Sequence, residues 1–309
     1  MRERLAAFRQ SRWFRAVWLV PIALVVLAAA ILAARGIRAS EGGQEFLAAF
    51  PGESELPDGA PVGFPAWVGW QHFLNSLFLL LIIRTGWQIR QGKRPSAFWT
   101  RKNTGLIKTK NPPTRIGLPV WLHFSVDALW VLNGIVFYVL LFSTGQWARL
   151  VPVSWDVIPN ALSAALQYLS LEWPVENGWV NYNALQLLAY FVTVFVAAPL
   201  AILSGIRMSP AWSRDWVRAS RLYPITIARR VHFPVMLYFV LFVIAHVTLV
   251  FATGALRNLN HMYAAQDDDA SWLGAGIFAG SVIVMVGVWV AARPLILQPI
   301  AALTGRLGR

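Results

Sequence analysis

Six long apolar stretches, separated by polar segments, dominate the chain. They cover residues 16–35, 66–87, 118–142, 183–206, 226–252 and 272–292. About 20 mostly apolar residues in a helix cross the hydrocarbon core of a bilayer, and a helix satisfies its own backbone hydrogen bonds there. The pattern therefore predicts an all-α integral membrane protein with six transmembrane helices.

The composition strengthens this prediction and removes several kinds of chemistry. Hydrophobic residues make up 57% of the 309 residues and charged residues only 13%, which leaves too little polar surface for a water-soluble fold of this size. The chain has no cysteine, so disulfides, iron–sulfur clusters and covalent C-x-x-C-H haem attachment are excluded.

The charged residues behind the net charge of +13 are distributed by side of the membrane. They do not form a basic surface of the kind that binds nucleic acid. If the N-terminus, residues 88–117, residues 207–230 and the C-terminus share one side, that side holds 22 of the 27 Lys and Arg. The three loops on the other side hold 11 of the 14 acidic residues. Basic residues favour the cytoplasmic side. We therefore expect both termini in the cytoplasm, a bacterial inner-membrane location surrounded by lipid, and no nucleic-acid partner.

The first apolar stretch has two interpretations. A basic segment followed by an apolar run is typical of a secretory signal peptide, but this run is longer than the usual apolar region of such a peptide. Arg35 and Arg38 also follow it directly. We therefore expect an uncleaved anchor helix, and cleavage would not change the orientation of the other five helices.

Four of the five histidines fall inside the apolar stretches. His232 and His246 are fourteen residues apart, so on one helix their side chains point within roughly 40° of each other and lie about 21 Å apart along the axis. The orientation inferred from charge puts His72 near the outer surface and His123 near the inner surface. The natural pairs are His72 with His246 outside and His123 with His232 inside.

Two histidine pairs at two depths are the ligand pattern of two stacked bis-histidine b-type haems. A single histidine in an apolar helix is more often a packed core residue, so the prediction rests on the matched set of four. Zinc is the metal rival, but zinc sites gather their ligands at one point, often with Cys or carboxylate. We expect His261, in an outer loop, to be solvated rather than to bind metal.

A few charged residues share the depth of the inner histidines. Asp127 lies one helical turn from His123, where it could hold a water or a proton beside the haem, serve a quinone headgroup, or pair with Arg84. Arg229 and Arg230 precede His232 by less than one turn. Together with Arg84 they suit haem propionates, and the first two equally suit the ordinary basic flank of a transmembrane helix.

The histidine arrangement resembles the di-haem cytochrome b membrane subunits of respiratory oxidoreductases. That family includes the cytochrome subunits of nickel–iron hydrogenase, formate dehydrogenase and thiosulfate reductase. The resemblance rests on His232 and His246 on one helix, preceded by two helices that each carry an early histidine, His72 and His123. It covers residues 66–255, and the segment TGALRNLNHMYA looks most like the thiosulfate reductase branch. The resemblance implies two haem b, electron exchange with a quinone, and a separate catalytic subunit, which in such relatives often contains molybdopterin.

These observations predict an electron-transfer membrane subunit with no substrate chemistry beyond quinone redox. We expect an anchor helix and outer loop over residues 1–65, a four-helix di-haem core over 66–255, and an outer loop, sixth helix and basic tail over 256–309. The outer loops are longer and acidic, so we expect the catalytic partner there and quinone nearer the inner haem. A proton-coupled transporter that uses the same histidines and Asp127, or a haem-free scaffold, stays open as an alternative.

The orientation can be tested with single cysteines, because the chain has none of its own. A cysteine placed at Asp268 should react with a membrane-impermeant thiol reagent added to intact cells, and a cysteine placed at Lys102 should react only after the membrane is permeabilised. Labelling in the opposite order would invert the predicted topology and exchange the two histidine levels.

Overall fold

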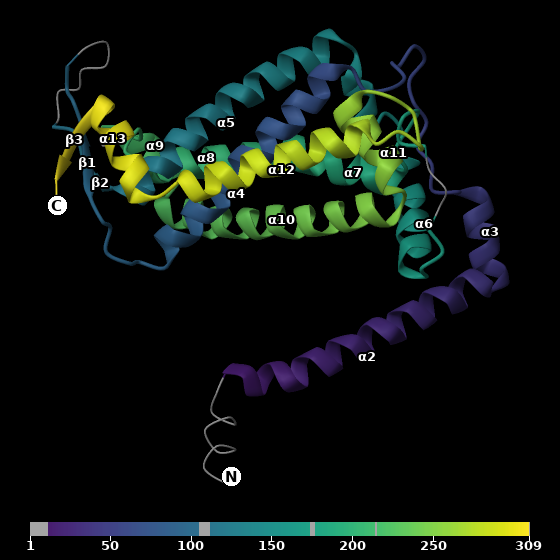
Figure 1. Ribbon diagram of the computed structural model, residues 1–309. Coiled ribbons are helices and arrows are strands. Elements are labelled where there is room, and N and C mark those ends of the chain that lie inside the picture. The colour runs from purple at the N-terminus through teal and green to yellow at the C-terminus, as the bar shows by residue number, and fades with distance from the viewer. Residues whose placement is uncertain (1–11, 105–111, 174–176, 214, 309) are drawn as a thin grey trace. The chain divides into compact units, whose positions relative to one another are not determined.

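The computed structural model describes residues 12–104, 112–173, 177–213 and 215–308 (Figure 1). In that part of the chain six helical segments are long and apolar enough to cross a membrane. Five are the single helices α2 (Arg12–Ala39), α4 (Ala66–Arg90), α5 (Leu118–Ser143), α10 (Ile225–Ala252) and α12 (Leu273–Ala291). The remaining one, Ala184–Met208, joins α7 (Ala184–Phe191), η2 (Val192–Ala197) and α8 (Ala198–Met208). The predicted all-α membrane architecture is confirmed.

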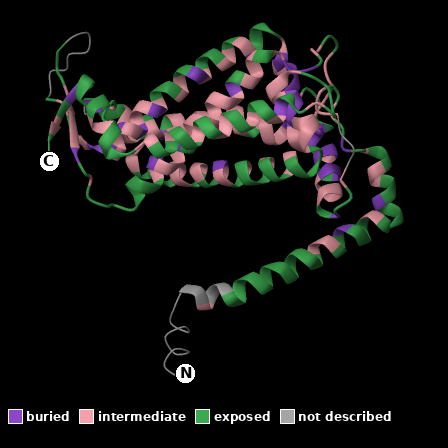
Figure 2. Cartoon of the chain, in the orientation of Figure 1, coloured by how far each residue is buried: buried purple, intermediate pink, exposed green. Residues whose placement is uncertain are grey.

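The outward faces of these helices are apolar and exposed, as a surrounding lipid phase requires. Figure 2 shows long exposed stretches on α10 and α12. Leu241 is 67% exposed and Ile283 is 73% exposed. In water such a surface would be unfavourable, whereas hydrocarbon chains cover it at no cost in lost hydrogen bonds.

The chain forms two compact units. The first contains residues 1–58, 148–177 and 181–190, with α2, α3 (Glu41–Ala49), α6 (Val157–Leu169) and the start of α7. A small apolar cluster joins α6 to α7; its buried members are Val157, Ala161, Ala184 and Leu187. Arg38 connects the end of α2 to the segment after α6, because its guanidinium donates to Ser170 Oγ at 2.6 Å and pairs with Glu172 at 2.7 Å.

The second unit contains residues 59–147, 178–180 and 191–309 and is built on two antiparallel helix pairs. In the α4–α5 pair, Trp67 at the start of α4 contacts Phe137 late in α5, with ring centroids 6.2 Å apart. Further along, Trp130 Nε1 donates to Asn75 Oδ1 at 3.0 Å. In the second pair α8 lies beside α10 (Figure 1), and α12 contacts α4 and places Phe278 against Phe251 of α10, with ring centroids 5.9 Å apart.

The fourth membrane segment changes its helical register in the middle. Residues Val192–Ala197 form a π-helix, which leaves backbone groups poorly paired within the segment. Tyr138 of α5 donates its hydroxyl to the carbonyl of Val194 at 2.7 Å, and the hydroxyls of Thr193 and Tyr238 lie 2.8 Å apart. These bonds replace the solvation that lipid cannot supply and tie the segment to α5 and α10.

A three-stranded sheet lies at one end of the second unit and was not predicted. The strands β1 (Phe98–Arg101), β2 (Arg115–Gly117) and β3 (Gly305–Gly308) are antiparallel in the order β2-β1-β3. The segment expected to be a basic tail forms α13 (Pro294–Thr304) and then β3. Leu118, Trp121 and Ala301 form a buried cluster between the sheet, α5 and α13, so the C-terminus is held against the start of α5.

The remaining short helices connect the long ones. They are η1 (Gln146–Arg149), α9 (Val217–Leu222), α11 (Ala255–Leu259) and the π-helix η3 (Asn260–Ala264). The η3 turn packs against the starts of α4 and α12. Asn260 is fully buried and anchors it: its amide donates to the carbonyls of Asp268 and Ser271 and accepts from Gly274 N. We call residues 255–271, which return the chain from α10 to α12, the outer strap. Outer is used for the end of the membrane helices where α4 begins, and inner for the end where α4 ends, as the charge distribution predicts.

Candidate functional site

The second unit brings four histidines together as two pairs. The ring centroids of His72 and His246 are 6.0 Å apart, and those of His123 and His232 are 6.4 Å apart. Two imidazole nitrogens that share one metal ion at about 2 Å each place their ring centroids about 6 Å apart. Both pairs therefore have the separation that a shared metal ion requires, and they are the pairs expected from depth and charge. Their role as ligands stays a prediction.

Each inner histidine meets a hydroxyl of the neighbouring helix at one ring nitrogen. Thr85 Oγ1 lies 2.7 Å from His123 Nδ1 and also donates to the carbonyl of Leu81 at 2.7 Å. A hydroxyl has one proton, so with that proton given to the carbonyl the oxygen accepts from His123 Nδ1–H. This tautomer leaves the lone pair on Nε2, the nitrogen that would bind a metal.

The second inner histidine is held in the same way. Ser204 Oγ lies 2.9 Å from His232 Nδ1 and donates to the carbonyl of Leu200 at 2.6 Å. Ser204, like Thr85, is completely buried. The two inner imidazoles therefore share one tautomer and one kind of partner. Metal-binding histidines usually donate their other ring N–H to an acceptor in this way.

A glycine follows each of these hydroxyl residues and keeps space beside the imidazole. A Cβ atom on Gly86 would lie 3.5 Å from His123 Cε1, and a Cβ atom on Gly205 would lie 3.5 Å from His232 Cε1. Longer side chains at either position would fill the space next to the ring. A flat macrocycle bound to the imidazoles needs that space, so the two glycines fit a haem site.

The outer pair has different surroundings. His72 Nδ1 lies 3.3 Å from the hydroxyl of Tyr263, which belongs to η3 of the outer strap. The His246 ring stacks on Phe242, with centroids 5.6 Å apart and planes 4° from parallel. Met262, beside Tyr263, packs its carbonyl so closely on α4 that a Cβ atom on Gly69 would lie 2.6 Å from it. The strap is thereby held over the outer end of α4.

Asp127 lies next to the inner pair. Its Oδ2 is 3.7 Å from His123 Nε2, too far for a hydrogen bond, and its side chain is 31% exposed. The alternative pairing with Arg84 does not occur among the described ion pairs. A carboxyl group beside the inner histidines and partly open to the surroundings can exchange a proton with a bound molecule.

Arg84 contacts the end of α12. These contacts do not support the prediction that Arg84 binds a haem propionate. Its guanidinium donates to the carbonyls of Trp289 and Ala292 at the end of α12 and covers the Trp289 ring, with the guanidinium carbon 4.5 Å from the ring centroid. A cation is favourable at the C-terminal end of a helix, where carbonyls lack partners. Arg229 and Arg230 are exposed in the second turn of α10.

His261 is buried, and the expectation that it would be a solvated loop residue is wrong. It is 4% exposed and lies between Phe64 and Trp179, with ring centroids 6.1 and 5.4 Å away. Its Nε2 lies 2.7 Å from Asp267 Oδ1, which also accepts from Arg257. This hydrogen bond from His261, supported by Arg257, lowers the pKa of Asp267 below its ordinary value.

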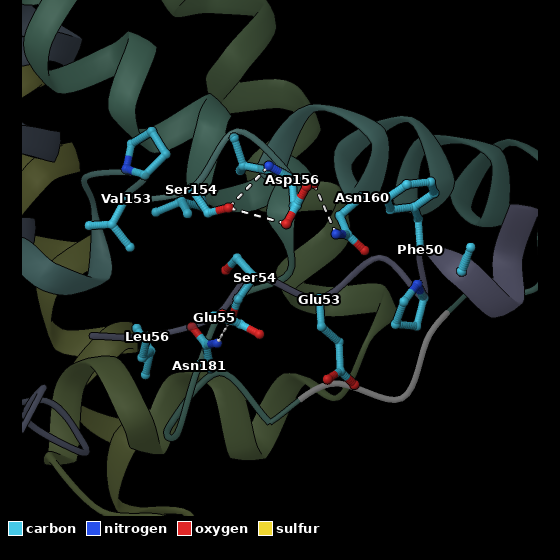
Figure 3. A pocket seen from close by; sticks show the side chains of 15 residues that line it. Phe50, Glu53, Ser54, Glu55, Leu56, Val153, Ser154, Asp156, Asn160 and Asn181 are labelled. Carbon is cyan, nitrogen blue, oxygen red and sulfur yellow. Dashed lines mark hydrogen bonds between the residues drawn. The ribbon is translucent and has the colours of Figure 1, made fainter. Parts of the chain in front are cut away.

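A pocket in the first unit carries a different chemistry. It has a volume of about 530 Å³, and Glu53, Glu55 and Asp156 line it together with Ser54 and polar amides (Figure 3). Figure 3 shows Ser154 beside the Asp156 carboxylate, to which its hydroxyl donates, and Asn160, whose amide donates to the main-chain carbonyl of Asp156. No group of three metal-binding side chains occurs in the described part of the chain. The pocket therefore gives no separate metal centre.

The sequence analysis missed the partners of the imidazole nitrogens. They are Thr85, Ser204 and Tyr263, and the two glycines beside the inner rings, Gly86 and Gly205, were also missed. A hydroxyl residue followed by glycine occurs near the inner end of both the second and the fourth apolar stretch, and this repeated dipeptide was the available indication.

The chain is similar to a reductase subunit. The putative protein-methionine-sulfoxide reductase subunit YedZ1 of Azospira oryzae is 27% identical over 197 residues, which cover 60% of this chain and 88% of that protein. No protein-family model matches the chain, and no solved structure matches it. The comparison supports a membrane subunit of an oxidoreductase and does not point to the hydrogenase or formate dehydrogenase type in particular.

The Asp267 contacts predict a pH dependence of the outer strap. A carboxylate whose pKa is lowered by folding stabilises the native state above its unfolded pKa of about 4, and this contribution is lost as the pH falls through the folded pKa. Protection of the strap amides against hydrogen exchange, corrected for intrinsic rates, should therefore fall in acid. Asp267→Asn should show the reduced protection already at neutral pH, and Asp269→Asn, an exposed neighbour, should behave as wild type. Equal protection in all three proteins would contradict this assignment.

Proposed function

We propose that this chain is the haem-binding membrane subunit of an oxidoreductase and carries electrons between a quinone pool and a catalytic partner. The observation that supports this most is the pairing of four histidines at 6.0 and 6.4 Å on separate helices. The similarity to a reductase subunit supports the same class of protein. Haem b supplies one-electron transfer when it is bound between such histidines.

The residues that would hold the group have matching chemistry. His123 and His232 form the inner ligand pair and His72 and His246 the outer pair. Thr85 and Ser204 fix the inner tautomer, which leaves a nitrogen lone pair for iron. Gly86 and Gly205 keep the adjacent space free. Arg229 and Arg230 are the cations that we assign to the inner propionates, because Arg84 is engaged by α12.

Asp127 is the residue that we assign to proton transfer with a quinone at the inner level. Oxidation of a quinol releases two electrons and two protons, so a group near the reacting hydroxyl must receive a proton. Asp127 is polar, partly exposed and 3.7 Å from His123. General acid–base groups need this closeness and access.

A catalytic partner at the outer face completes the proposal. The outer loops include the longest one, residues 143–182, and carry most of the acidic residues, whereas the inner loops are basic. The relative is named as a subunit of a putative reductase, and a reductase consumes electrons. Electrons would then pass from quinol on the inner side to the partner on the outer side. A molybdopterin-containing enzyme is the partner class that the resemblance implies.

Optical spectra test the ligand assignment. The purified protein should show a Soret band and sharp reduced α-bands, with two haem b per chain. His123→Ala and His232→Ala should each remove one and the same haem, and His72→Ala and His246→Ala should each remove the other.

His261→Gln is the matched control, because His261 is also buried and belongs to the same unit but has Asp267 as its partner, and glutamine keeps a donor for that partner. It should retain both haems. A wild-type protein without haem would support the transporter or scaffold alternative, and two haems in any of the four ligand variants would show that the pairing is wrong.

Asp127→Asn tests the proton-transfer role. The variant should keep both haems and an unchanged spectrum, while the rate of haem reduction by a water-soluble quinol falls about 100-fold, the usual effect of losing a general base. Reduction by dithionite, which needs no proton acceptor, should be unaffected. If quinol reduces the variant at the wild-type rate, Asp127 has no part in the reaction.

A further inference from the structure

The two inner histidines differ from His72 in what their Nδ1 atoms contact. Both inner histidines contact a buried hydroxyl at short distance, 2.7 Å for Thr85 and 2.9 Å for Ser204. The outer His72 contacts the Tyr263 phenol at 3.3 Å, a longer and weaker contact. The difference comes from the fold, because Thr85 and Ser204 lie on the membrane helices α4 and α8, whereas Tyr263 lies on the outer strap.

The inner hydroxyls are also the better acceptors. Each donates its proton to a carbonyl of the preceding helical turn, at 2.7 Å from Thr85 to Leu81 and at 2.6 Å from Ser204 to Leu200. A hydroxyl that donates becomes more electron-rich at oxygen, so consecutive hydrogen bonds strengthen one another in a low-dielectric interior. The imidazole Nδ1–H is therefore polarised more strongly at the inner pair than at His72.

Polarisation of Nδ1–H changes the metal-binding nitrogen of the same ring. As the proton is drawn toward its acceptor, the imidazole becomes a stronger electron donor to a metal ion. A stronger donor stabilises oxidised iron, with its higher charge, more than reduced iron. The reduction potential falls accordingly, because second-shell hydrogen bonding is one of the means by which a protein sets the potential of a haem.

We infer that Thr85, Ser204 and Tyr263 are positioning residues that give the inner histidine pair the lower reduction potential and the outer pair the higher one. The inference rests on the proposed function and gives a physical reason for the direction of electron flow proposed there, because electrons move spontaneously from the lower potential at the inner level to the higher potential at the outer level. Thr85 and Ser204 act on the same potential, and Tyr263 acts on the other.

Potentiometric titration of the purified haem-loaded protein, followed at the α-bands, tests the inference. The wild type should titrate in two one-electron steps. Ser204→Ala and Thr85→Val should each raise the lower potential by about 59 mV, which corresponds to a tenfold change in the reduction equilibrium, and leave the upper potential in place. Tyr263→Phe should shift only the upper potential.

Matched variants separate this role from a structural one. Thr85→Ser keeps a hydroxyl and should restore the wild-type potentials, even if Thr85→Val binds haem poorly. Ser125 makes the same backbone bond, to Trp121 O at 2.9 Å, with no histidine contact in the described structure, so Ser125→Ala should leave both potentials unchanged.

The possible results distinguish a failure of the proposed function from a failure of the inference. A wild-type protein without haem defeats the proposed function itself. Two haems with a lower potential that is unmoved in both Ser204→Ala and Thr85→Val, or an upper potential moved by either, leaves the proposed function standing and overturns the inference. An unchanged spectrum and unchanged potentials in Tyr263→Phe would remove Tyr263 from it.

Discussion

A histidine inside a membrane protein must satisfy both ring nitrogens without water, and this constraint organises the second unit. An unpaired imidazole N–H in hydrocarbon is unfavourable by several kcal/mol. The inner histidines meet the constraint through Thr85 and Ser204, each of which returns its own proton to a helix carbonyl. The contacts fix how α4 lies against α5 and how α8 lies against α10. One nitrogen of each ring is thereby settled by the fold, and the other keeps its lone pair.

The same requirement explains the outer strap. His72 lies near the outer end of α4, and the partner of its Nδ1 comes from a segment that folds back over the helix. Buried Asn260 and the His261–Asp267 pair hold that segment in place. In the sequence Asn260, His261 and Asp267 look like ordinary polar loop residues. In the fold they hold the segment that carries Tyr263.

The sequence predicts what depends on local periodicity. Apolar runs identify the six spans to within about four residues at each end, because length and hydropathy are properties of each segment alone. The distribution of charge predicts the orientation of these spans, and that orientation predicts that the four histidines lie at two depths. Contacts between distant segments are not visible in this way. In the sequence Thr85 looks like any small helix residue, and only the fold places it beside His123. Arg84 likewise caps a helix only because α12 ends next to it. Strand β1 pairs with β3, which lies some 200 residues later in the chain.

The α4–α5 and α8–α10 hairpins repeat one arrangement, a hydroxyl–glycine dipeptide on the first helix against a histidine on the second. This repetition has a consequence for biogenesis. Each hairpin covers the Nδ1–H of its own inner histidine, so each can enter the bilayer during synthesis without presenting that donor to lipid. Each half of the inner site is thus complete within its own hairpin, and the approach of His123 to His232 depends only on how the two hairpins pack against each other.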